Sequence, residues 1–238
     1  MTDVRSVVAS ACQVLARAGQ GDLIWGHAAA RDPDGRGAWL KAAGYGLDEI
    51  DATRVHLVDR YGEVLEGDGR RHIEYPIHTE ILAARPDVGG VVHTHAPSVI
   101  AFAATGHPLR PISHDASLFV PPGLARFEET GDLIVTPELG GAVAASLGTR
   151  NAVALVHHGL VTVGPDVALA TIYAILLERA CDSQLRAESA GGVVSWSSDA
   201  EALSKRARHG AEANLRAAFA YLERGRRAES TANGPWTS

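Results

Sequence analysis

Helical and strand-like runs of apolar residues alternate along the chain. Apolar positions that recur every three or four residues predict helices, and short alternating or continuous apolar runs predict strands. The helices are expected at residues 4–18, 76–85, 97–104, 136–148, 166–190 and 199–224. The strands are expected at residues 23–31, 55–59, 63–66, 91–95, 152–156 and 160–163. Strands that come first in a cluster and then between helices predict one layered α/β domain with a mixed sheet.

Proline and glycine mark the ends of several of these elements. Pro76 and Pro97 fit the first turn of a helix, where the missing N–H of proline breaks no hydrogen bond. Residues 106–129 are rich in both types, so we expect irregular structure there that could cover a site. From residue 226 the chain is polar and poor in large apolar residues. We therefore expect one domain over residues 1–225 and a disordered tail over 226–238.

Composition and charge exclude several classes of protein. The 238 residues are 46% hydrophobic and 21% charged, which is typical of a globular protein with a sizeable core. A net charge of −6 argues against nucleic acid or an anionic membrane as the main partner. The N-terminus lacks a basic-then-apolar signal pattern, and Cys12 and Cys181 fit small core residues in a reducing compartment. We expect a cytoplasmic protein without nucleic-acid or membrane partners.

The stretch Val91-Val92-His93-Thr94-His95 carries the strongest chemical signal. Residues i and i+2 of a strand point to the same side, so both imidazoles would share one face. Two neutral imidazoles that converge from rigid backbone can bind a divalent transition metal. The other interpretation of this motif is a pair of ordinary core or surface histidines.

Two further segments could complete a site with this motif. His157-His158-Gly159 follows a predicted strand, and three protein ligands with an open position form the catalytic type of metal site. Glu74 lies just before a predicted helix and is the best candidate for an acid or base. Its other interpretation is an exposed carboxylate at a helix N-terminus.

Taken in order, these motifs resemble the class II aldolase/adducin family, which includes fuculose-phosphate aldolase and ribulose-phosphate 4-epimerase. The resemblance covers about residues 4–215 and rests on Glu74-x-x-x-His78, Arg85-Pro86-Asp87-Val88, Val91-Val92-His93-Thr94-His95-Ala96-Pro97 and His157-His158-Gly159. It implies that His93, His95 and His158 are metal ligands, the last because the family's ligand directly precedes glycine, and that Glu74 is the catalytic acid/base. It also implies a three-layer α/β/α fold, with a central mixed and largely antiparallel sheet, and a homotetramer with active sites at subunit interfaces.

The chain departs from the sugar-phosphate members of that family at their phosphate-binding segments. Where those members have Gly-Asn-x-Ser, Thr-Gly and Ser-Ser, this chain has Gly26-His27-Ala28-Ala29, Ala43-Gly44 and His72-Ile73. Because hydrogen-bond donors are lost, binding of a phosphate dianion would be weakened. The histidine at position 27 is similar to the family's decarboxylase branch, which acts on hydroxylated aromatic or pyridine carboxylates. The aldolase tyrosine is also missing, and His114 is a candidate to replace it.

These residues predict a divalent-metal-dependent carbon–carbon lyase that works through a metal-bound enolate. We favour decarboxylation of a small hydroxylated, aromatic carboxylic acid over aldol cleavage of a sugar or sugar phosphate. Zn²⁺ is the expected metal, with Mn²⁺, Fe²⁺ and Co²⁺ as alternatives. Candidates for binding the substrate are His27, Arg71 and Arg31, with Lys41 and Arg70 as further cations. A non-heme iron oxygenase and a non-catalytic adducin-like interaction protein are the remaining alternatives.

Overall fold

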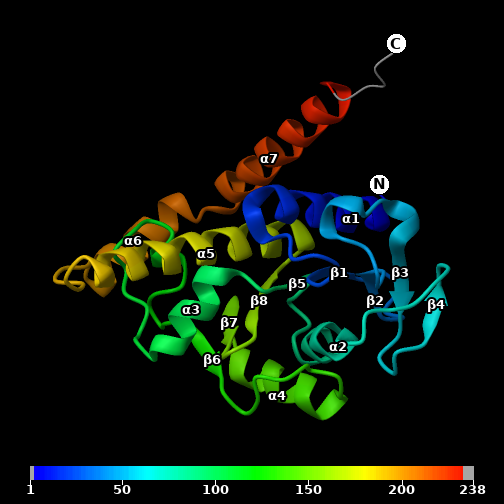
Figure 1. Cartoon of the computed structure of the whole chain (residues 1–238), viewed down its shortest axis with the longest axis horizontal. Helices are drawn as coiled ribbons and strands as arrows, with labels where there is room; N and C mark the ends of the chain where they lie inside the picture. Colours follow the sequence, from blue (N-terminus) through cyan, green and yellow to red (C-terminus); the bar gives the residue numbers. More distant parts are fainter. Residues whose placement is uncertain (1–2, 233–238) are drawn as a thin grey trace.

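The computed structural model describes residues 3–232, which form a central sheet with helices on both of its faces (Figure 1). The helices are α1 (Val4–Leu15), α2 (Tyr75–Ala84), α3 (Pro97–Thr105), α4 (Pro137–Leu147), α5 (Val167–Ser189), α6 (Asp199–His209) and α7 (Glu212–Ala232). The strands are β1 (His27–Arg31), β2 (Ala38–Lys41), β3 (Val55–Val58), β4 (Val64–Glu66), β5 (Gly90–Thr94), β6 (Ala125–Phe127), β7 (Ala152–Leu155) and β8 (Gly159–Gly164). Shorter helical segments lie at Ala16–Gln20, Leu47–Glu49, Ala52–Arg54 and Ala116–Leu118.

The strands form one eight-stranded sheet in the order β4-β3-β2-β1-β5-β8-β7-β6. Neighbouring strands are antiparallel, except that β6 and β7 are parallel. β5, which carries the His-x-His motif, lies near the middle of the sheet between β1 and β8. This confirms the predicted three-layer α/β/α fold with a mixed, largely antiparallel sheet.

Alternate residues of the central strands belong to two separate cores. Val92 of β5 packs in a core with residues of α1, α3, α5 and α7, whereas Val91 packs in a core with residues of α2 and α4. Figure 1 shows α1, α5 and α7 on one side of the sheet and α2 and α4 on the other. Because both faces of the strands are covered, the strand sequences are continuous apolar runs. Cys12 and Cys181 are buried in the first core, as predicted.

Two strands differ from the prediction for the first half of the chain. β1 begins only at His27, because Asp22 and Trp25 form an isolated bridge across a tight turn in which Leu23 has φ 48°. β2 has no counterpart among the predicted strands. Its four residues end on a lysine, Lys41, which is nevertheless completely buried.

The predicted single helix over residues 199–224 is two helices, α6 and α7. The chain breaks at Gly210, where an added Cβ would lie 2.5 Å from Leu118 Cδ2 and 2.7 Å from the Arg206 carbonyl oxygen. α7 continues to Ala232, past the expected start of a tail at residue 226, and residues 233–238 lie outside the described part.

The segment 106–129 is less irregular than expected, since it contains β6. This short strand pairs with β7, and Arg126 Nη2 donates a hydrogen bond to the Ala103 carbonyl oxygen 2.9 Å away. Among the helices of residues 3–232, none is long and apolar enough to cross a membrane.

Candidate metal centre

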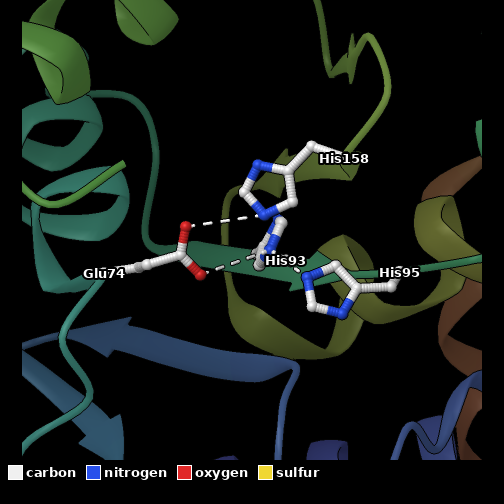
Figure 2. A group of neighbouring side chains, drawn as sticks. All are labelled: Glu74, His93, His95 and His158. Carbon is white, nitrogen blue, oxygen red and sulfur yellow. Dashed lines mark hydrogen bonds and ion pairs between the residues drawn. The ribbon is translucent and has the colours of Figure 1, made fainter. Parts of the chain in front are cut away.

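Four side chains from three segments of the chain meet at the end of β5 (Figure 2). His93 lies on β5 and His95 just after it, His158 lies in the turn between β7 and β8, and Glu74 directly precedes α2. Their potential ligand atoms all lie within 4.8 Å of one another. The structure therefore brings together all four residues that the motifs predict for the metal site and its acid/base.

The distances among these atoms suit a shared metal ion. His93 Nε2 lies 3.2 Å from His95 Nε2 and 3.8 Å from Glu74 Oε2, and His158 Nε2 lies 3.5 Å from Glu74 Oε1. Donor atoms about 2.1 Å from one tetrahedral ion lie about 3.4 Å from each other. The residues present therefore fit a divalent transition metal.

Hydrogen bonds orient two of the imidazoles toward the centre. His93 Nδ1 lies 2.8 Å from the Leu160 carbonyl oxygen, and His95 Nδ1 lies 2.7 Å from Asp22 Oδ2. Both acceptors require a proton on Nδ1, so the Nε2 lone pairs face the centre, as metal-binding histidines require. Asp22 gives no recognisable signal in the sequence, because its role depends on a turn that folds back onto β5.

The position of His158 depends on its two neighbours. His157 has φ 64°, a left-handed conformation, and its side chain is exposed. A Cβ on Gly159 would lie 2.5 Å from the Thr94 carbonyl oxygen, so only glycine lets β8 begin this close to β5. The His158 ring is consequently buried with its centroid 4.9 Å from that of His93.

Among the three predicted metal ligands, His158 is the one with no hydrogen bond to either ring nitrogen within residues 3–232. Burial lowers the pKa of His158 to about 4, so its ring is neutral near pH 7. A buried, neutral and unpartnered imidazole is well suited to coordinate a metal ion.

Glu74 is not the exposed capping carboxylate of the alternative interpretation. It occupies the N-cap position of α2, but its side chain caps nothing and is 2% exposed. Oε1 accepts a hydrogen bond of 2.9 Å from the Ile134 backbone N–H. Burial raises the pKa of the carboxyl group above its usual value, which favours a residue that can hold and release a proton.

A cavity of about 510 Å³ opens beside Glu74 and His95. Apolar side chains form much of its wall, and these are Ile24, Trp25, Ile73 and Leu133. Arg70, Arg71 and His72 add polar groups. The Arg71 guanidinium lies 4.2 Å from the centroid of the Tyr75 ring, and its Nε donates a hydrogen bond to the Gly62 carbonyl oxygen.

A second group of histidines lies beside Glu74 and His93. His27 is completely buried, pairs with His93 across β1 and β5, and places Nε2 3.6 Å from Glu74 Oε2. Its ring centroid lies 4.0 Å from that of His72 and 4.8 Å from that of His78. His78 carries no predicted role, although its spacing of four residues from Glu74 on α2 could have indicated a shared helix face.

Two predicted site residues lie elsewhere. The structure corrects the prediction that Arg31 binds the substrate. Its guanidinium donates to the carbonyl oxygens of Leu82, Arg85 and Val88 and so holds the end of α2. His114 lies beside His209, with ring centroids 5.5 Å apart, in a separate pocket along α6. A single chain therefore does not bring His114 to the metal centre.

Lys41, a further predicted cation, lies beneath the turn before β1. Its Nζ donates a hydrogen bond of 3.0 Å to the Ile24 carbonyl oxygen.

The chain is similar to proteins with known activities. It is 32% identical over 204 residues to 3,4-dihydroxyphthalate decarboxylase of Arthrobacter keyseri, which covers 80% of this chain and 81% of that protein. It is 38% identical over 128 residues to 4-hydroxy-3-prenylphenylpyruvate oxygenase/4-hydroxy-3-prenylbenzoate synthase of Streptomyces roseochromogenus subsp. oscitans, over 52% of this chain and 46% of that protein.

Its fold is similar to that of L-fuculose 1-phosphate aldolase from Glaciozyma antarctica PI12. The TM-score is 0.82 at 27% identity, over 95% of this chain and 90% of that one. The sequence profile of the Class II Aldolase and Adducin N-terminal domain matches residues 6–185. The chain therefore belongs to the class II aldolase and adducin family, as its motifs predict.

Proposed function

We propose that this protein is a divalent-metal-dependent carbon–carbon lyase that removes CO₂ from a small hydroxylated aromatic carboxylic acid. The observation that carries the proposal is the metal centre beside a pocket with apolar walls and arginines at its edge. The similarity to 3,4-dihydroxyphthalate decarboxylase supports the choice of decarboxylation.

His93, His95 and His158 are the residues that would hold the metal ion. Zn²⁺ is the ion we favour, and Mn²⁺, Fe²⁺ and Co²⁺ suit the same imidazoles. When bound, the ion supplies a Lewis acid for substrate oxygens. Asp22 and the Leu160 carbonyl group keep His95 and His93 in the orientation that this requires.

The pocket residues bind and orient the substrate. Trp25, Ile73 and Leu133 exclude water from the faces of a planar ring. Within residues 3–232 the two Nη groups of Arg71 donate no hydrogen bond, so they can take a carboxylate through two parallel hydrogen bonds. Stacking on Tyr75 holds the guanidinium in place for that contact.

Glu74 supplies the proton that the reaction consumes. When the bond to the carboxylate carbon breaks, its electron pair remains on the ring carbon and CO₂ leaves. A proton must then reach that carbon, and Glu74 lies beside the pocket with a carboxyl pKa that burial raises above its usual value, which suits a group that takes up and delivers protons. The hydrogen bond from Ile134 N–H to Oε1 fixes the position of the carboxyl group beside the pocket.

A phosphate substrate suits this pocket poorly. Ala43-Gly44 and His72-Ile73, two of the three segments that have lost donors, line the cavity together, and His27 of the third contacts His72. Burial lowers the pKa of His72 to about 4 and that of His27 well below its usual value. Neither imidazole is therefore charged near neutral pH, so they cannot replace the missing donors as cations.

A mononuclear iron oxygenase is the second candidate. The specific observation in its favour is the 38% identity to the oxygenase/synthase, which spans residues of the same family domain. A strict requirement for both Fe²⁺ and O₂ would favour this reaction over a lyase.

We also propose a homotetramer with active sites at subunit interfaces. Large apolar side chains are exposed around the cavity, and they include Leu23 (74% exposed), Trp25 (47%) and Ile73 (50%). A neighbouring subunit could cover this rim. Light scattering at micromolar concentration would give the mass of four chains, and a monomer would refute the proposal.

The substrate assay compares two classes of compound with the same metal-loaded enzyme. We expect CO₂ release from ortho-hydroxylated aromatic acids and little cleavage of fuculose- or ribulose-type phosphates. Efficient sugar-phosphate cleavage without CO₂ release would refute the decarboxylase and favour the aldolase.

A further inference from the structure

Two buried histidines face each other behind Glu74. His78 lies one helical turn after Glu74 on α2, and His27 lies on β1 opposite His93. His27 Nδ1 and His78 Nε2 are 2.6 Å apart, and both side chains are completely buried. Nitrogen atoms at this distance share one proton in a hydrogen bond, and the ring that accepts it is neutral. One ring must donate and the other must accept.

One direction of this hydrogen bond leaves two poor contacts. If His27 donates from Nδ1, neutral His78 must carry its proton on Nδ1, which has no partner within the described residues 3–232. A buried N–H without an acceptor is strongly unfavourable. The Nε2 lone pair of His27 would also face Glu74 Oε2 at 3.6 Å, and two electron-rich atoms repel each other.

The opposite direction is the better of the two: His27 Nε2 also lacks a hydrogen-bond partner within residues 3–232, but its proton then faces a carboxylate oxygen. His78 Nε2–H then donates to His27 Nδ1, and neutral His27 carries its proton on Nε2, where it faces the Glu74 carboxylate. What remains at His78 Nδ1 is an unused lone pair, which is less costly than an unused proton. At 3.6 Å the contact from His27 to Glu74 is an electrostatic one, longer than a hydrogen bond.

We propose that His78 is a positioning residue that holds His27 as the Nε2–H tautomer, so that His27 orients the Glu74 carboxylate. The carboxylate is then held from both ends, by Ile134 N–H at Oε1 and by His27 at Oε2. The value of this arrangement for catalysis rests on the proposed function, in which Glu74 transfers the proton. The arrangement itself is a property of the chain.

The positions of the imidazole protons also decide what the second group of potential ligands can bind. His27, His72 and Glu74 also place ligand atoms within 4.8 Å of one another and could form a second metal site. However, the Glu74 backbone N–H lies 3.4 Å from His72 Nδ1, which must accept there and carry its proton on Nε2. With protons on both Nε2 atoms, the group presents donors and not ligands. The protein should therefore bind one metal ion per chain.

The tautomers can be read from long-range ¹H–¹⁵N spectra of the full chain, labelled in histidine and loaded with Zn²⁺. His27→Gln identifies the signals of His27. We expect a proton on Nε2 of His27 in the wild type and in H78Q, whose side-chain amide can still donate. In H78L, which lacks the donor, the Nε2–H form should no longer be the single tautomer. H56Q, at a buried histidine on β3, is the matched control and should change nothing at His27.

Zinc titration and kinetics complete the test. We expect one zinc per chain in the wild type and in all four variants, and in H78L a kcat lower by about 10–100-fold, with a smaller change in KM and recovery in H78Q. A proton on Nδ1 of His27 in the wild type, or a second zinc that His27→Gln removes, would overturn the inference. Since the spectra need no substrate, absence of lyase activity with the expected tautomer would refute only the proposed function.

Discussion

The imidazoles around Glu74 are the same chemical group held with two opposite hydrogen-bond polarities. His93 and His95 carry Nδ1 protons toward the Leu160 carbonyl oxygen and Asp22, which turns Nε2 lone pairs to the centre. In contrast, His27, which faces the same Glu74 Oε2 atom as His93, accepts at Nδ1 and carries its proton on Nε2. The first arrangement binds a cation, and the second stabilises an anion. The partner of the remote nitrogen therefore decides what each histidine can do.

The largest expected effect separates the ligands from their neighbour. His93→Ala, His95→Ala and His158→Ala should each lose the metal ion, because too few imidazoles remain. His157→Ala should keep it, since that side chain is exposed. Elemental analysis of the purified variants measures this. Loss of metal from His157→Ala together with its retention in His158→Ala would contradict the assignment.

A second prediction compares two buried carboxylates on the same segment. Glu74→Gln should retain metal but lose about 10²–10⁴-fold in kcat, because the amide cannot transfer a proton. Glu80 is also buried but pairs with Arg60 at 2.8 Å, so Glu80→Gln should change stability and leave kcat nearly unaltered. Steady-state kinetics with thermal melts distinguishes the two. Equal losses of kcat would show that Glu74 has no special role.

A third prediction compares two arginines that look alike in the sequence. Arg71→Ala should raise KM by roughly 10–100-fold, since a hydrogen bond to a charged group contributes about 1.5–3 kcal/mol. Arg31→Ala should instead lower the melting temperature with little change in KM, because its donors hold carbonyl groups at the end of α2. If Arg31→Ala raised KM and Arg71→Ala did not, the location of the substrate carboxylate would be wrong.

The smallest effect concerns stability against pH in metal-free protein. Burial lowers the pKa of His72 to about 4 and of His78 to about 3, below their unfolded value. Folding thus favours the neutral rings, and stability should fall as the pH drops from about 6.5 toward 4. Each such histidine contributes up to about 1.4 kcal/mol per pH unit. H78Q should flatten the curve, measured by urea unfolding, and an unchanged slope would contradict this.

The fold was predictable where the pattern of apolar residues is unambiguous. β5 follows from Val91-Val92, and α5 was expected over 166–190 and spans Val167–Ser189. β2 escaped prediction because Lys41 is buried by tertiary packing that no local pattern reveals. The division of the last helix was also missed, because the need for Gly210 arises from its contact with Leu118, far away in the sequence.

The candidate site divides in the same way. His93 and His95 could be recognised because strand geometry places them together, and His158 through the family resemblance, in which the ligand directly precedes a glycine. Asp22 could not, because its role depends on a turn that meets β5 only in the folded chain. The spacing of His78 from Glu74 indicates a shared helix face, but its contact with His27 on β1 also arises only on folding. Arg31 was assigned wrongly since sequence cannot distinguish a free guanidinium from one that binds backbone carbonyl groups.

The most direct test of metal-dependent decarboxylation titrates zinc or manganese into metal-free protein and follows release of ¹³CO₂ from a carboxyl-labelled ortho-hydroxylated aromatic acid. The predicted rate rises in proportion to metal up to one ion per chain and then stays constant, and His158→Ala remains inactive throughout. Release that is independent of metal, or that continues to rise up to two ions per chain, would contradict the assignment of His93, His95 and His158 as the catalytic metal site.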